Sequence, residues 1–182
     1  MQRNFEIRIR WRAFPLHPET PEEGIPLEEV YAARNIDAAA AKARMQNVAR
    51  ELGLPWGERK RTYNSRLAQE LGKWAEDKGR GDAFHGAVFR AYFVEGVNIA
   101  NTEELEKLAK AAGLPAPEAG EVLRKRTYRE AVDADWALSR QMGISAVPTF
   151  VLDGRGVVGA QPYEVLEHLL QNGGVQRKEN RR

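Results

Sequence analysis

Apolar and charged residues alternate strictly over residues 5–12, where the apolar positions are Phe5, Ile7, Ile9 and Trp11. A period of two with charges on the second face predicts a β-strand that is buried on one side only. Three prolines follow within a few residues, at positions 15, 18 and 21. Because proline interrupts both sheet and helix, this stretch is predicted to be an ordered loop.

The middle of the chain has the periodicity of amphipathic helices, and glycines mark several of the helix ends. The predicted helices cover approximately residues 41–52, 65–79, 82–96, 102–113, 117–125 and 127–142. Asp133 and Asp135, in the last of these, are interpreted as part of a solvated helix face.

The pattern changes after Gly143. Two short apolar runs, residues 147–152 and 157–160, flank the turn sequence Asp153-Gly154-Arg155-Gly156 and predict a β-hairpin. Pro162 suits the first turn of a closing helix that ends at Gly173. The predicted order is therefore a strand, a long helical block, a hairpin and a helix.

Composition excludes several kinds of chemistry. The chain has 182 residues and no cysteine, which rules out a thiol nucleophile, a disulfide and a cysteine-bound metal within it. The net charge is +2, and four of the last eight residues are basic while one is acidic. The remainder is close to neutral, so nucleic acid is not an expected partner, because such binding needs a basic face on the folded body.

No stretch approaches the roughly 18 apolar residues of a membrane span, and the first residues lack the apolar segment of a signal peptide. We therefore expect no membrane partner and a cytoplasmic location.

Metal and cofactor sites have little support in the sequence. His17, His85 and His168 are far apart and show no metal-binding spacing, and no glycine-rich phosphate loop is present. Ser139 and Ser145 have no histidine nearby in sequence that could activate them. We expect no metal, no catalytic residue and no tightly bound cofactor in this chain.

The stretch from Ile144 to Phe150 is the most informative. A proline that opens a strand lacks the N–H that pairing requires, so it needs a turn, an edge position or a cis bond. Base rates favour a trans bond, since only about 5–6% of X–Pro bonds are cis. The order of helix, Gly143, Val147-Pro148-Thr149, hairpin and helix matches the C-terminal half of a thioredoxin-like domain, and this context predicts a cis bond.

Five short segments resemble the DsbA family, in particular its FrnE-like branch, which is related to 2-hydroxychromene-2-carboxylate isomerases and kappa-class glutathione transferases. The C-terminal segments are Val147-Pro148-Thr149-Phe150-Val151 and Val158-Gly159-Ala160-Gln161-Pro162, and the earlier ones span residues 11–18, 64–68 and 91–96. Departures are Gln69, where the branch commonly has histidine, and His17, where asparagine is usual.

The resemblance implies an α/β fold, namely a thioredoxin-like fold with a large all-helical insertion. Residues 1–26 and 144–174 are then predicted to form the sheet and its closing helix, and residues 27–143 the insertion. Residues 175–182 are predicted to be a disordered basic tail.

The resemblance also implies a dithiol–disulfide oxidoreductase or isomerase. Ala146, Val147, Pro148 and Thr149 would then bind substrate, which is an extended peptide or a disulfide-containing protein. One alternative is a glutathione-dependent isomerase or transferase, with glutathione held by the same loop. The other is a non-catalytic peptide-binding module.

Family members begin with a strand and a helix that carries Cys-x-x-Cys, or a serine in the glutathione-using relatives. Both elements are absent from this chain, which we expect to be redox-inactive as printed. Either the natural chain begins upstream of Met1, or the protein is a cysteine-free relative. Without the first strand, residues 5–12 and 147–152 would have open edges. They would pair with another copy to form a homodimer, or move together to close the gap.

Overall fold

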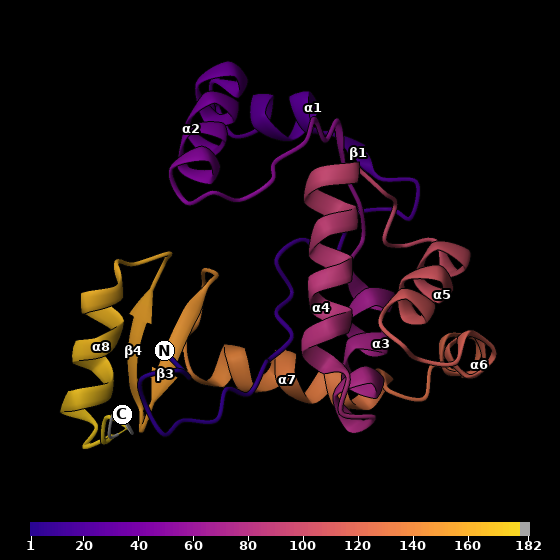
Figure 1. Cartoon of the computed structure of the whole chain (residues 1–182). Helices are drawn as coiled ribbons and strands as arrows, with labels where there is room; N and C mark the ends of the chain where they lie inside the picture. The colour runs from indigo at the N-terminus through magenta and orange to yellow at the C-terminus, as the bar shows by residue number, and fades with distance from the viewer. Residues whose placement is uncertain (179–182) are drawn as a thin grey trace. The chain divides into compact units, whose positions relative to one another are not determined.

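A computed structural model of the chain describes residues 1–178 and contains two compact units. Unit 1 is formed by Met1–Leu16 and Ala134–Arg182, and unit 2 by His17–Asp133. The chain therefore leaves unit 1, builds a largely helical unit 2 and returns (Figure 1). The α/β organisation with a large helical insertion agrees with the sequence analysis.

Unit 2 contains seven helical segments and one small strand pair, and it ends within an eighth helix (Figure 1). Its elements are β1 (Ile25–Pro26), α1 (Leu27–Ala32), α2 (Ala38–Glu51), β2 (Arg61–Thr62), α3 (Arg66–Asp77), α4 (Gly81–Arg90), the π-helix η1 (Ala91–Glu95), α5 (Thr102–Ala111), α6 (Ala116–Lys125) and the start of α7 (Arg129–Gln141). The sequence analysis missed α1 and the strand pair, which are each only a few residues long.

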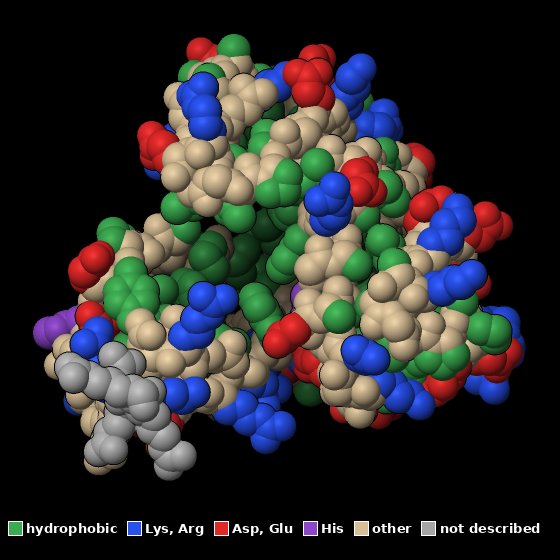
Figure 2. Space-filling view, in the orientation of Figure 1, with side chains coloured by type: hydrophobic (Ala, Val, Ile, Leu, Met, Phe, Trp, Pro, Cys, Tyr) green, Lys and Arg blue, Asp and Glu red, His purple; other side chains and the backbone are tan. Residues whose placement is uncertain are grey.

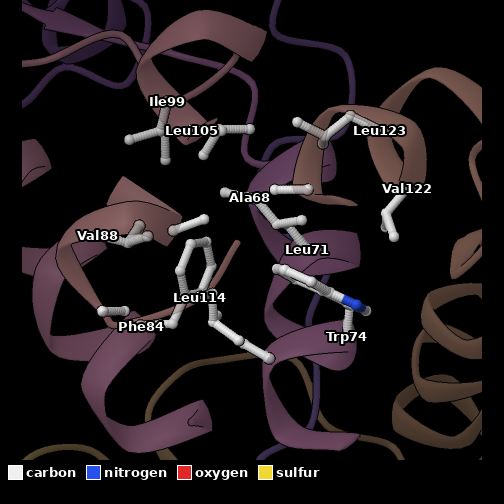
Figure 3. Packing of buried hydrophobic residues seen from close by; sticks show 14 residues of the cluster. Ala68, Leu71, Trp74, Phe84, Val88, Ile99, Leu105, Leu114, Val122 and Leu123 are labelled. Atoms are coloured by element: carbon white, nitrogen blue, oxygen red, sulfur yellow. The ribbon is translucent and has the colours of Figure 1, made fainter. Parts of the chain in front are cut away.

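The core of unit 2 lies among α3, α4, α5 and α6 (Figure 3). Leu71 and Trp74 of α3 meet Phe84 of α4, and all three side chains are almost fully buried. Alanines line much of the remaining contact and allow the helices to approach closely. This packing explains why the helical periodicity of the sequence located these four helices.

A buried carboxylate joins α3 to the connection after α6. Glu70 is 1% exposed, and its oxygens accept hydrogen bonds from Arg66 Nε (2.6 Å) and from Arg126 Nε and Nη2 (both 2.7 Å). Arg66 also pairs with Asp133 (2.7 Å) and donates to the carbonyl of Arg129 (2.8 Å). Burial alone would raise the pKa of Glu70, but the hydrogen bonds and charges of Arg126 and Arg66 outweigh it, and the pKa is lowered.

Unit 1 contains the rest of α7, a hairpin of β3 (Thr149–Leu152) and β4 (Arg155–Val158), and α8 (Tyr163–Asn172). The strands are antiparallel, with Thr149 opposite Val158 and Leu152 opposite Arg155. Asp153 and Gly154 alone form the turn, with φ of 48° and 77°. Positive φ at both positions gives the tight turn that matches strand twist, so β4 begins two residues earlier than the predicted strand 157–160.

The predicted strand over residues 5–12 is wrong. Only Phe5 forms a bridge, to Arg177, and the backbone of residues 6–12 adopts no regular strand in the structure. Phe5 is fully buried, whereas Ile9 and Trp11 are 49% and 44% exposed. An alternating pattern indicates that a segment could form a strand with one buried face. The strand forms only where a neighbouring segment supplies the backbone hydrogen bonds.

Residues 175–178 of the predicted tail contact the N-terminal segment. The amide of Lys178 donates to the carbonyl of Asn4 (2.9 Å), and the Arg177 guanidinium lies 5.6 Å from the centre of the Phe5 ring. The rest of that predicted tail, residues 179–182, lies outside the described residues. Within residues 1–178, no helix is both long and apolar enough to cross a membrane.

We expect Glu70→Gln to lower the free energy of unfolding by about 1.5–3 kcal/mol, because it weakens the hydrogen bonds that Arg66 and Arg126 donate to a charged group. The lowered pKa means that ionised Glu70 stabilises the fold above its unfolded-state pKa of about 4.3. That stabilisation is lost as the pH falls through the lower folded-state pKa. Urea unfolding measured from neutral to acidic pH should therefore show a smaller acid-induced loss in the variant.

The matched control is Glu121→Gln, an exposed carboxylate that pairs with Arg124 and Lys125 on the surface of α6. It should leave the neutral-pH unfolding curve nearly unchanged. Equal destabilisation by both substitutions would show that burial of Glu70 is not what matters.

Candidate functional site

The loop that enters β3 holds the four residues predicted to bind substrate. Its Val147–Pro148 peptide bond is cis. Thr149 Oγ1 donates to the carbonyl of Ala146 (2.6 Å), and the amide of Gly159 donates to the carbonyl of Pro148 (2.7 Å). Val147 and Pro148 are exposed, while Ala146 and Thr149 are partly buried. The loop is thus fixed at its base and open at its tip.

The hydrogen-bonding phase of the hairpin decides which backbone groups of β3 face outward. Since Gly159 bonds to Pro148, the alternation of an antiparallel ladder directs the N–H and C=O of Phe150 and Leu152 toward β4. The same groups of Thr149 and Val151 point away from β4. Within residues 1–178, no hydrogen bond is formed by the outward backbone groups of these two residues.

The loop therefore continues into an open strand edge. Its side chains are also accessible, with Val147, Phe150 and Val151 between 39% and 44% exposed. Hydrophobic side chains reach the surface in the region of β3 and β4 (Figure 2). An edge with free donors and acceptors beside apolar side chains can bind an extended chain by adding it as a further strand.

A buried aspartate fixes the N-terminal segment of unit 1 to α7. Asp135 is 2% exposed, and its two oxygens accept from Arg12 Nη1 (2.6 Å) and from the amide of Ala13 (3.0 Å). The interpretation of Asp135 as part of a solvated face is wrong. Val132, Asp135 and Ser139 are all buried and follow one another at intervals of three and four residues, so the helical spacing did contain the signal.

The remaining candidates do not gather into a site. His85 contacts Glu76 (3.2 Å) and so links α4 to α3. No group of three or more potential metal ligands occurs within residues 1–178. Ser139 is buried, and its hydroxyl donates to the carbonyl of Asp135 within α7 (2.9 Å).

Comparison with known proteins shows which family the chain belongs to. The sequence profile of the DSBA-like thioredoxin domain matches residues 1–171. The chain belongs to this family. It is also 24% identical over 168 residues to the uncharacterized protein YwbO of Bacillus subtilis, a match that covers 92% of this chain and 82% of YwbO.

Two solved structures extend the comparison of this DSBA-like chain. A probable DsbA oxidoreductase from Streptomyces coelicolor is 33% identical, with a TM-score of 0.81 over 90% of this chain and 74% of the other. A structure from Nitrosomonas europaea has a TM-score of 0.60 at 20% identity, and covers 74% of this chain and 72% of its own. The second supports the fold alone.

Family chemistry requires a thiolate that attacks a sulfur atom to form a mixed disulfide. The 182-residue DSBA-like chain has no cysteine, so its own side chains cannot perform that step. What its geometry can do is bind an extended chain through the backbone of the loop and β3.

We expect Asp135→Asn to release residues 12 and 13 from α7, because the neutral amide binds Arg12 more weakly than a carboxylate does. The free energy of unfolding should fall by about 1.5–3 kcal/mol, the usual range for hydrogen bonds to a charged group. Amide hydrogen exchange at Ala13 should become faster. Glu130→Gln, an exposed position on the same helix, is the control and should change neither quantity.

Proposed function

We propose that Ala146, Val147, Pro148 and Thr149 form the substrate-binding part of a DsbA-type site of the FrnE-like branch. The ligand is an extended segment of a disulfide-containing protein, and the complete activity is dithiol–disulfide oxidoreduction or isomerisation. The observation that carries this proposal is the open edge of β3, where the outward N–H and C=O of Thr149 and Val151 adjoin the loop.

Two further observations support a polypeptide ligand. No residue from 144 to 152 is charged, so an added strand meets no desolvation cost from ionised side chains there. Acidic and basic side chains are interspersed over the helices of unit 2 on the face shown, with no extended basic patch (Figure 2). The same backbone groups suit the cysteinyl part of glutathione, which makes a glutathione-dependent isomerase or transferase the second candidate.

The first test is chemical. We expect the 182-residue chain to reduce insulin no faster than buffer and not to refold a scrambled disulfide substrate, since it offers no thiolate. Turnover above the buffer rate would show that the chain performs disulfide exchange without a cysteine thiolate, and would contradict this expectation. The codons upstream of Met1 are also informative. A Cys-x-x-Cys helix there supports the oxidoreductase, a serine supports the isomerase, and a stop codon supports a binding module.

The second test is binding, followed by the amide NMR signals of the chain during titration with an extended apolar peptide. Signals of Ala146, Val147, Thr149 and Val151 should shift, because their backbone groups form the proposed site. Val147→Glu should weaken binding, since it places a charge where the peptide packs. Val158→Glu makes the same change at a 55% exposed position of β4 and should not.

Shifts at these amides with reduced glutathione but not with peptide would favour the isomerase or transferase. No shift with either ligand would contradict the assignment of this loop.

A further inference from the structure

Asparagine followed by glycine occurs once in this chain, at Asn172-Gly173, where α8 ends. The backbone nitrogen that follows an asparagine can attack the carbon of the side-chain amide, because the ring that forms has five members. A following glycine has no Cβ to obstruct this attack and reaches the required backbone angles most easily. The other seven asparagines precede larger residues, so the sequence leaves Asn172 the most open to this reaction.

The packing of α8 explains why residue 173 is a glycine. A Cβ at this position would overlap the side chain of Leu152, because the end of α8 packs directly against β3. A larger residue would have to displace Leu152 from its place. The reactive pair is therefore a consequence of how the helix meets the hairpin.

Both reacting groups are accessible. The side chain of Asn172 is exposed, and its amide forms no hydrogen bond within residues 1–178. The amide of Gly173 donates to the carbonyls of Leu169 (3.2 Å) and Leu170 (3.1 Å), which are longer distances than the usual one of about 2.9–3.0 Å. These bonds belong to the last turn of a helix, which opens more readily than the helix interior. Opening of this turn lets the nitrogen of Gly173 reach Cγ of Asn172.

Arg155 of β4 binds the carbonyl group that joins the two residues. Its Nη1 donates to the main-chain oxygen of Asn172 (2.9 Å), and α8 lies beside β4 (Figure 1). When Gly173 loses its amide proton, the negative charge spreads onto this oxygen through the conjugated peptide bond. A cationic donor at that oxygen stabilises the charge, as donors do for oxyanions in acyl transfer. The side chain of Arg155 is long and exposed, so it can follow the oxygen when the turn opens.

We propose that Asn172 is a site of spontaneous deamidation, which Arg155 promotes and directs. Gly173 gives its amide proton to water or hydroxide, and its nitrogen forms a bond to Cγ of Asn172. The bond from Cγ to the side-chain nitrogen breaks, and that nitrogen leaves as ammonia with a proton taken from water. The product is a cyclic imide that contains the nitrogen of residue 173 and both carbonyl groups of residue 172.

Water then opens the imide at one of its two carbonyl groups. Addition at Cγ breaks the bond from Cγ to nitrogen and leaves aspartate. Addition at the main-chain carbonyl breaks the other ring bond to nitrogen and leaves isoaspartate, which is joined to Gly173 through Cγ. The nitrogen recovers a proton in both cases. Because Arg155 donates to the main-chain oxygen, it makes that carbonyl the better electrophile, and isoaspartate is the expected main product.

The product alters the end of α8. Isoaspartate adds one carbon to the main chain, so the amide of Gly173 loses its bonds to Leu169 and Leu170. The new carboxylate also lies at the C-terminus of a helix, where the helix dipole disfavours a negative charge. The amides of Gly174 and Val175, which donate to carbonyls of α8, should then exchange with solvent faster.

Incubation of the 182-residue chain at mildly alkaline pH, followed by peptide mapping with mass spectrometry, tests the site. The peptide with Asn172 should gain the mass difference between an amide and an acid, mostly as isoaspartate. Peptides with the other seven asparagines should change much more slowly. Asn172→Gln should remove the product, because a glutamine would have to form a larger ring. An unchanged Asn172 in the folded chain, under conditions where the urea-unfolded chain deamidates, would overturn the proposal.

Arg155→Met tests the role of the guanidinium. In the folded chain it should slow deamidation about tenfold and lower the ratio of isoaspartate to aspartate, since one hydrogen bond from a charged group is lost. Arg140→Met removes an exposed arginine of α7 in the same unit and should change neither quantity.

The same comparison in urea separates loss of the donor from a weaker helix. The unsubstituted and Arg155→Met chains should deamidate at equal rates when unfolded, because Arg155 is then no longer held at Asn172. A weaker α8 alone would speed the reaction in the folded variant. Equal or faster deamidation of folded Arg155→Met would therefore overturn the role of Arg155.

Discussion

Strand β3 has backbone hydrogen-bonding groups on both edges, and among residues 1–178 only one edge has a partner, which is β4. Peptide N–H and C=O groups need partners wherever they lose water, and the turn at Asp153 and Gly154 fixes which groups face β4. Thr149 and Val151 are left facing outward in consequence. The proposed binding by unit 1 depends on this hydrogen-bonding pattern, because a register shift of one residue would direct the other set of backbone groups outward.

Buried carboxylates hold distant parts of the sequence together in both units. In unit 2, Glu70 joins Arg66 to Arg126, which are far apart in sequence. In unit 1, Asp135 binds the segment at Arg12 and Ala13 to α7. A buried charge is costly when unpaired, so each of these contacts fixes one arrangement of its segments rather than simply adding stability.

Sequence periodicity located the long helices and the hairpin because each buries one face, and burial produces the repeat that can be read. The prediction failed at residues 5–12, because a strand needs a neighbouring segment to pair with and the local sequence does not show whether one is present. Glu70 and Asp135 were missed because a carboxylate on a helix is usually solvated, although the spacing of Asp135 from Val132 and Ser139 does place it on the buried face of α7. The loop at Ala146–Thr149 was identified through the family resemblance. Only the structure showed which backbone groups of β3 face away from β4.

Binding and chemistry are separable in this DSBA-like chain. The family's exchange reaction needs a thiolate, which a cysteine-free chain cannot supply, but strand addition needs only backbone groups in a fixed phase. Those groups are supplied by the hairpin and its entry loop, which form within unit 1 without a nucleophile. Under the proposed function, an extended peptide would pair with these donors and acceptors before any side chain contributes specificity.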